Sequence, residues 1–253
     1  MINQKKGINK SEKSFDALIL AAGKGKRFRD SGGSVLKQVA EYESVPVIKR
    51  LYDQLSANKK IKEIIVVLSN DSSDQEVIKA AIGSNKVNYL INHDCENDNN
   101  LISFLVAAQN VENNLIVLEC DCVSEETDID KMLSSTLQND ITFSNLGSID
   151  NYKYGGVIEL SDSKKPKKIH VFSEEEMILF KKDFQGAKLF GATCFGKEAL
   201  TKYKKMSQEL TDKKNKYFLE VAIAYPNSFV FKTVKMSRNS FHFNTLNEFN
   251  KKS

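Results

Sequence analysis

The strongest constraint on the fold is an alternation of apolar and amphipathic segments over the first 121 residues. The apolar segments are those at 15–20, 62–68, 87–91 and 115–118. The segments with helical periodicity that separate them are those at 46–58, 74–83 and 101–111. Strands that alternate with helices predict a mostly parallel sheet with right-handed crossovers and helices on both faces. We therefore expect a three-layer α/β/α fold.

The second half of the chain is less regular. Two β-rich segments at 154–160 and 167–172 bracket a turn-rich stretch, which predicts a hairpin or small β-arm added to the sheet. No proline-rich linker or internal repeat divides the chain. We expect a flexible leader at 1–14 and a single domain over 15–253, made of the halves 15–125 and 126–253.

A glycine turn lined with basic residues follows the first predicted strand. The apolar run ends at Gly23 and Gly25, Arg27 follows, and Lys37 comes ten residues later. Backbone N–H groups in such a turn form a concave anion site, to which the cations add charge. A dinucleotide fingerprint would need glycine where Phe28 stands, and the spacing of the glycines is not that of a P-loop. A tight turn with exposed lysines stays an alternative.

Polar residues follow other strands of the same predicted sheet. The stretch at 92–100 comes after the third strand, and Asp121 closes the fourth. Ligands of open α/β sheets bind beyond the carboxyl ends of the strands. We therefore expect the glycine turn, the stretch at 92–100 and Asp121 to form one site.

Composition excludes several classes of protein. The formal charge of +4 is small and its lysines are scattered, which does not favour a nucleic-acid groove. No apolar stretch is long enough to span a bilayer, so no membrane contact is expected. The four cysteines have neither disulfide-framework nor zinc-finger spacing. Reduced thiols and a cytoplasmic location are expected.

The glycine turn resembles the signature loop of the nucleotidylyltransferases that activate sugar phosphates and related compounds. That family has the pattern L-x-A-G-x-G-x-R, with a lysine about ten residues after the arginine. The positions that fill the pattern here are Leu20, Ala22, Gly23, Gly25, Arg27 and Lys37. The resemblance implies a Rossmann-like nucleotidyltransferase fold, with a nucleotide-binding half at 15–125 and an acceptor-binding half at 126–253.

The resemblance continues at lower density and is closest to the phosphocholine cytidylyltransferase branch. It implies that Ala21 belongs to the nucleotide-binding loop and that Asn92 and Asn99 or Asn100 lie against the base. Asp121 matches the metal-binding aspartate of the family. Asn244 stands where many members have a second aspartate, so a second metal ligand there is weaker, and a helix-cap role is the alternative.

The reaction implied by the resemblance is Mg²⁺-dependent transfer of a nucleoside monophosphate, preferably CMP from CTP, to a small phosphorylated acceptor. Arg27 would grip the leaving pyrophosphate and Lys37 would meet the α-phosphate. The acceptor would be phosphocholine or a phosphonate, and a place in cell-surface polysaccharide synthesis is expected. A sugar-1-phosphate or molybdopterin-type nucleotidylyltransferase and a non-catalytic nucleotide-binding module stay open as alternatives.

Aromatic residues of the second half have two interpretations. They are most simply core residues, but several converging on the acceptor pocket would hold a quaternary ammonium by cation–π attraction. The residues concerned are Tyr152, Tyr154, Phe172, Phe190 and Phe195.

Overall fold

The computed structural model describes residues 13–252 apart from 98–99, 163–164, 184 and 211. The predicted leader therefore lies almost entirely outside the described residues. Within the described residues, a nine-stranded sheet has the order β10-β9-β11-β6-β1-β4-β5, with β8 paired to β11 and β12 paired to β8. Its strands are β1 (Phe15–Leu20), β4 (Ile61–Ser69), β5 (Asn88–Asn92), β6 (Asn114–Glu119), β8 (Asp140–Ser148), β9 (Gly155–Leu160), β10 (Pro166–Phe172), β11 (Gln185–Phe195) and β12 (Val230–Lys235).

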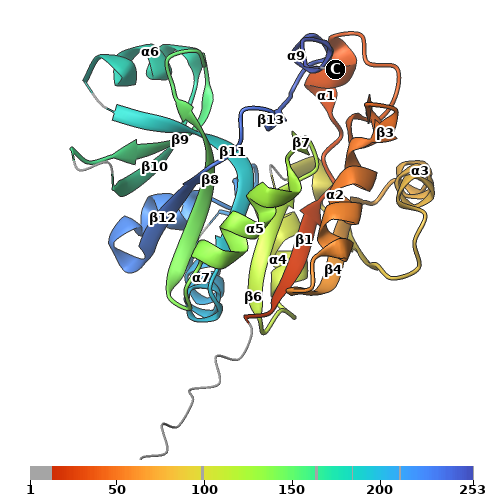
Figure 1. Ribbon diagram of the computed structural model, residues 1–253, viewed down its shortest axis with the longest axis horizontal. Helices are drawn as coiled ribbons and strands as arrows, with labels where there is room; N and C mark the ends of the chain where they lie inside the picture. Colours follow the sequence, from red (N-terminus) through yellow and green to blue (C-terminus); the bar gives the residue numbers. More distant parts are fainter. Residues whose placement is uncertain (1–12, 98–99, 163–164, 184, 211, 253) are drawn as a thin grey trace, which may run out of the picture.

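Helices cover both faces of this sheet, as Figure 1 shows. The α-helices are α1 (Lys26–Asp30), α2 (Val47–Ala57), α3 (Ser72–Ile82), α4 (Leu101–Ala108), α5 (Glu126–Ser135), α6 (Glu174–Asp183), α7 (Lys197–Glu209), α8 (Glu220–Ala224) and α9 (Leu246–Asn250). Single 3-10 turns lie at Lys37–Val39, Cys95–Asn97 and Pro226–Ser228. The short strand pairs are β2 (Glu41–Tyr42) with β3 (Val45–Pro46), and β7 (Cys122–Val123) with β13 (Phe241–His242).

Strand β1 is buried on both faces, which explains its unbroken apolar sequence. Leu18 and Leu20 pack in the core layer that contains α4, α7 and α8. Ala17 and Ile19 pack in the opposite layer, with α2, α3 and α5. Side chains of a strand alternate between faces, so a central parallel strand needs apolar residues at every position. The predicted three-layer, Rossmann-like α/β fold is confirmed.

The sheet changes character between its two halves. Strands β6, β1, β4 and β5 are parallel, as the alternating pattern predicts. Strand β11 runs antiparallel to β6 and also pairs with β8 and β9. The predicted β-arm is the antiparallel pair of β9 and β10, which Figure 1 shows beside α6 at the upper left. No helix among the described residues is long and apolar enough to cross a membrane.

The ends of two helices show how local sequence sets their bounds, and one of them differs in detail from the sequence pattern. Helix α2 begins at Val47, and Pro46 is its N-cap with extended backbone rather than its first helical residue. Asp71 caps α3, because its carboxylate accepts hydrogen bonds from the N–H groups of Ser73 and Asp74, and Gly83 ends that helix in the left-handed conformation.

The end of the chain returns to the first turn of the molecule. Phe28 of α1 packs edge-on against Phe243 and Phe249, within a separate apolar cluster. The backbone N–H of Leu246 donates to the hydroxyl of Ser31. Figure 1 shows α9 beside α1 at the top of the molecule. This packing places residues 241–248 over the carboxyl ends of β1 and β6.

Candidate active site

The glycine turn that follows β1 is held against Lys37. Gly25 has a φ of +59° and is the N-cap of α1. A Cβ atom at Gly25 would lie 3.0 Å from the Cβ of Lys37, so the position needs glycine for both its backbone conformation and its space. Gly23 differs, because a Cβ atom there would meet nothing within 4 Å. Its surface is open, which suits close approach of a ligand to the backbone.

Gln38 supports the turn from below, and the sequence analysis missed it. Its side-chain amide is buried and donates to the carbonyl oxygens of Ala21 and Gly23, at 2.9 and 2.7 Å. These bonds satisfy two carbonyl groups of the loop and hold it in place. Ala21 itself is buried and does not line the cavity described next.

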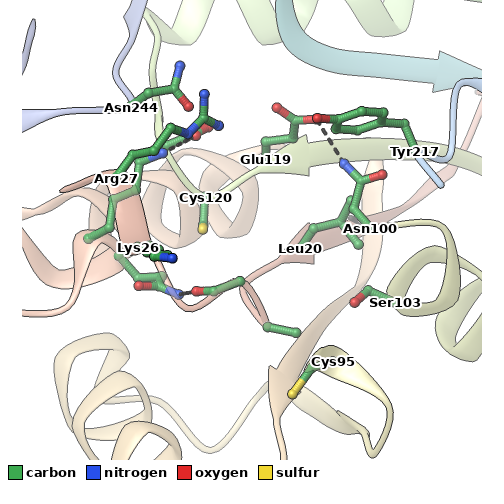
Figure 2. Close-up of a pocket in the computed structure, with 16 residues that line it drawn as sticks. Leu20, Lys26, Arg27, Cys95, Asn100, Ser103, Glu119, Cys120, Tyr217 and Asn244 are labelled. Atoms are coloured by element: carbon green, nitrogen blue, oxygen red, sulfur yellow. Dashed lines mark hydrogen bonds and ion pairs between the residues drawn. The ribbon is translucent and has the colours of Figure 1, made fainter. Parts of the chain in front are cut away.

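A cavity of about 310 Å³ lies over this turn, at the carboxyl ends of β1 and β6 (Figure 2). It brings together most of the residues that the sequence singled out. Predicted residues that line it are Leu20, Ala22, Gly23, Gly25, Arg27, Lys37, Asn100, Asp121 and Asn244. Its other lining residues are Lys26, Gln38, Cys95, Ser103, Glu119, Cys120 and Tyr217. We call this space the first cavity.

Lys37 and Asp121 form an ion pair in the first cavity. The ammonium of Lys37 lies 2.5 Å from a carboxylate oxygen of Asp121, and both side chains are mostly buried. Burial alone would raise the pKa of Asp121, but the ammonium beside it holds that pKa below its usual range. Burial would likewise lower the pKa of Lys37, yet the carboxylate raises it. Both groups are therefore charged at neutral pH.

Arg27 and Asn244 face the cavity from the α1 and α9 side. Figure 2 shows their side chains together on one side, with Glu119, Tyr217 and Asn100 on the other. Asn244 is not the cap of α9, because the hydroxyl of Thr245 accepts the hydrogen bond from the N–H of Glu248. The helix-cap alternative for Asn244 is therefore wrong.

The asparagines predicted to read a base differ in position. Asn100 lines the first cavity, where its side-chain amide donates to Glu119 at 3.1 Å and its oxygen accepts from the N–H of Phe218 at 2.7 Å. Asn92 is buried behind the wall, and its amide group bonds to the hydroxyl of Ser103 and the N–H of Asp94. Asn92 thus supports residues of the wall rather than lining it. Asn99 lies outside the described residues.

Glu119 is a partly buried carboxylate that the sequence analysis did not select. Burial, followed by the charge of Asp121, raises its pKa to about 7. It ends β6 and stands two residues before Asp121. Its position at the carboxyl end of a central strand was the available signal, but an acidic residue at a strand end is also an ordinary surface feature.

A second cavity, of about 460 Å³, adjoins the first. The residues that line both cavities are Arg27, Glu119, Asp121, Tyr217 and Asn244. The remainder of the second cavity comes from strands β8, β9, β10 and β11, from the loop at 151–154, and from the segments at 218–219 and 241–251. Four of the predicted aromatic residues line it, namely Tyr152, Tyr154, Phe172 and Phe190. Phe195 does not, and packs in the core against Phe104 and Tyr203.

The oxygen ligands around Asp121 suit a hard cation. The carboxylates of Asp121 and Glu119 and the amide of Asn244 line both cavities. Within the described part of the chain, no group of three or more His, Cys, Asp or Glu side chains is placed to hold a metal. Mg²⁺ typically binds one or two carboxylates and completes its shell with waters and substrate phosphates. The residues present therefore fit Mg²⁺ bound together with a phosphate.

Comparison with known proteins gives one family and a set of structural neighbours. Residues 17–148 match the family model described as MobA-like NTP transferase domain. No curated protein matches the chain in sequence.

The fold is shared with several solved nucleotidyltransferases. CTP:phosphocholine cytidylyltransferase (LicC) from Streptococcus pneumoniae has a TM-score of 0.73 at 17% identity, over 94% of this chain and 97% of that chain. The inositol-1-phosphate CTP transferase from T. maritima has a TM-score of 0.71 at 15% identity, over 92% and 90%. HddC from Yersinia pseudotuberculosis has a TM-score of 0.63 at 19% identity, over 93% and 96%. At these identities the likeness shows the fold.

Proposed function

The chain belongs to the family of MobA-like NTP transferase domains, and we propose that it transfers CMP from CTP to a small phosphorylated acceptor, such as phosphocholine or a phosphonate, with release of pyrophosphate. One observation carries the proposal: Arg27, Lys37 and Asp121 line one cavity, and Arg27 and Asp121 also line the cavity beside it. Two substrates that must react with each other need two adjoining sites with shared charged residues. The choice of CTP is supported by the two structural neighbours whose names include CTP.

In the proposed reaction, an oxygen of the acceptor's phosphate attacks the α-phosphorus of CTP. A new P–O bond forms, the bond from the α-phosphorus to the bridging oxygen breaks, and pyrophosphate leaves with the electron pair. The acceptor phosphate is largely dianionic at pH 7, because its second pKa is about 6, so no general base is needed. The barrier comes from bringing two anions together, and cations placed beforehand lower it.

Each charged residue then has a role. The open backbone at Gly23 holds the β- and γ-phosphates, and Arg27 binds the leaving pyrophosphate with its planar fork of donors. Lys37 pairs with Asp121 before substrate enters. When CTP binds, the α-phosphate becomes a second anionic partner for the Lys37 ammonium. Arg27 and Asp121 stand where the two cavities join, which is where the reacting phosphates meet.

Asp121, with Asn244 and Glu119 beside it, would hold Mg²⁺. When bound, the ion supplies positive charge that neutralises the phosphate oxygens and orients them.

The direct test is pyrophosphate release with each of the four NTPs, Mg²⁺ and a panel of phosphorylated acceptors. We expect release with CTP and a small phosphate or phosphonate. A preference for a sugar 1-phosphate or a pterin phosphate would instead favour those alternatives. Binding of NTP, seen as a thermal shift, without release for any pair would show a nucleotide-binding module that does not catalyse transfer.

A further inference from the structure

A lysine with few partners is buried in the second cavity. Lys188 of β11 is only 4% exposed and lines that cavity but not the first. Its ammonium has two hydrogen-bond acceptors, the carbonyl oxygens of Gly156 and Leu189, both at the long distance of 3.4 Å. No carboxylate of the described residues lies within 4.0 Å of it. An ammonium has three donors, and leaving a buried charge weakly bonded is costly.

The backbone around Lys188 leaves room for its ammonium. Gly155 has a φ of +100°, and a Cβ atom there would lie 2.9 Å from the nitrogen of Lys188. Both the conformation and the space at this position therefore need glycine. The ammonium is also 5.8 Å from the centre of the Tyr152 ring. These contacts fix the lysine in the wall of the cavity rather than leaving it free to reach solvent.

The presence of Lys188 argues against a cage for a quaternary ammonium. The ammonium of Lys188 already lies over the ring of Tyr152, where a quaternary ammonium would have to bind. Burial lowers the pKa of Lys188 to about 8, with the carboxylates of Glu119 and Asp121 opposing that shift, so it is still mostly charged at neutral pH. A choline group in the same part of the cavity would place two positive charges together at low dielectric.

The other charged side chains of the second cavity indicate how much negative charge it accepts. The cations that line it besides Lys188 are Arg27, Lys153 and Lys251, and the acids are Glu119, Asp121 and Glu248. Arg27 is shared with the first cavity and belongs to the reacting phosphates. The carboxylate of Glu248 faces the same space and would repel a highly charged group. A group with one negative charge therefore matches Lys188 better than a second phosphate dianion does.

We propose that Lys188 binds a carboxylate of the acceptor, so that the acceptor is a small phosphate or phosphonate ester or acid bearing a carboxylate as well as the group that receives CMP. This inference rests on the proposed function and narrows its acceptor. Lys188 acts here as a specificity residue that touches the end of the acceptor remote from the reacting phosphorus.

The experiment uses three phosphonates of equal chain length, 3-phosphonopropionate, propylphosphonate and 3-aminopropylphosphonate, with phosphocholine as a fourth acceptor. Pyrophosphate release is followed with CTP and Mg²⁺. For the wild-type protein we expect kcat/KM for 3-phosphonopropionate to exceed that for propylphosphonate by about 10- to 100-fold, the value of a charge-assisted hydrogen bond. A wild-type preference for phosphocholine or 3-aminopropylphosphonate would overturn the inference.

The variant Lys188→Met keeps the length and apolar stem of the side chain. It should raise KM for 3-phosphonopropionate about 10- to 100-fold while leaving KM for CTP and turnover of propylphosphonate near wild type. Lys168→Met, at an exposed lysine of β10, is the matched control and should change neither. An equal loss with every acceptor, in both Lys188→Met and Lys188→Gln, would show that Lys188 only supports the fold. That result would overturn the inference.

Failure of the proposed function is separable from failure of the inference. If no acceptor yields pyrophosphate, binding of 3-phosphonopropionate and of propylphosphonate to the protein with CTP is measured by titration calorimetry. Tighter binding of the carboxylate that disappears in Lys188→Met would uphold the assignment of Lys188 without catalysis. Equal binding of the two compounds would contradict it.

Discussion

The two cavities that meet at Asp121 are built in different ways. The first lies where parallel strands β1 and β6 end, and most of its lining comes from residues 20–121. The second is enclosed by antiparallel strands β9 and β11 and by the returning segment at 241–251. The first cavity therefore follows from the parallel sheet that the sequence pattern predicts, whereas the second depends on the pairing of segments that are far apart in the chain. Under the proposed function, the first cavity takes the nucleotide and the second takes the acceptor.

The largest expected effect is at the ion pair of Lys37 and Asp121 in the first cavity. Lys37→Met should lower kcat by about 10²-fold or more, the scale of losing one preorganised charge that stabilises the transition state. Because Asp121 would lose its partner, the variant should also be less stable. Turnover is measured well below the unfolding temperature, with CTP binding as a check on folding. Unchanged kcat would remove Lys37 from the reaction.

A second test concerns Asp128 of α5, whose carboxylate holds the segment that leads to β13 and Asn244. The Asp128 carboxylate accepts a hydrogen bond from the backbone N–H of Ser237 at 2.8 Å and another from the hydroxyl of Ser240 at 2.7 Å. It also forms an ion pair with Lys131. Burial alone would raise the pKa of Asp128, but these bonds lower it. Asp128→Asn should reduce the free energy of unfolding by about 1–3 kcal/mol at neutral pH.

The pH dependence of that difference has a definite sign. The folded pKa of Asp128 lies below the unfolded value of about 4, so its stabilisation is complete above that value and is lost as pH falls through the folded pKa. Urea unfolding of both proteins between pH 7 and pH 3 checks this. The difference in stability should shrink below about pH 4. A difference that stays constant would show that the charge of Asp128 is not the cause.

The glycines of the turn give a matched pair. Gly25→Ala should destabilise the protein by about 1–2 kcal/mol, because its left-handed backbone and its contact with Lys37 disfavour a side chain. Gly23→Ala should leave thermal stability unchanged, since a Cβ atom meets no neighbour, yet weaken CTP binding if phosphates approach that backbone. Thermal unfolding with and without CTP separates the two. Equal CTP-induced shifts for Gly23→Ala and wild type would contradict phosphate binding at that position.

The smallest effect is expected at Lys24, an exposed lysine of the glycine turn that does not line the first cavity. Lys24 forms an ion pair with Glu96 in which both side chains are well exposed. Exposed pairs contribute little because water and salt screen them. Lys24→Met should leave the melting temperature and kcat unchanged, and it serves as the control for Lys37→Met. A loss of turnover comparable to that of Lys37→Met would mean that bulk positive charge, not position, matters.

The contrast between the two cavities also explains which features could be predicted from the sequence. The parallel order of β1, β4, β5 and β6 was predictable from periodicity, and so was the gathering of Arg27, Lys37 and Asp121 at one edge. The position of Lys188 was not predictable, because β11 joins the sheet antiparallel and pairs with three strands, which no local pattern specifies. Tyr217 was not predictable either, because it lies in the irregular segment between α7 and α8. Asn92 stays a prediction as a residue near the base; the structure places it behind Ser103, because a polar residue at a strand end can support the wall as well as line it.

Gln38 and Glu119 illustrate a second limit. Gln38 lines the first cavity, and its amide donates to two carbonyl groups of a loop that precedes it by 15 to 17 residues. Glu119 becomes unusual through burial, which raises its pKa to about 7. Neither the burial of a polar side chain nor its contact with a distant loop is encoded in residue type or spacing.

The most direct measurement is a crystal structure of the protein with a non-hydrolysable CTP analogue, Mg²⁺ and 3-phosphonopropionate. The account predicts the triphosphate over Gly23 and Arg27, the metal ion on Asp121, and the phosphonate at the boundary of the two cavities with its carboxylate toward Lys188. A triphosphate bound elsewhere, or a first cavity that stays empty at saturating analogue, would contradict it.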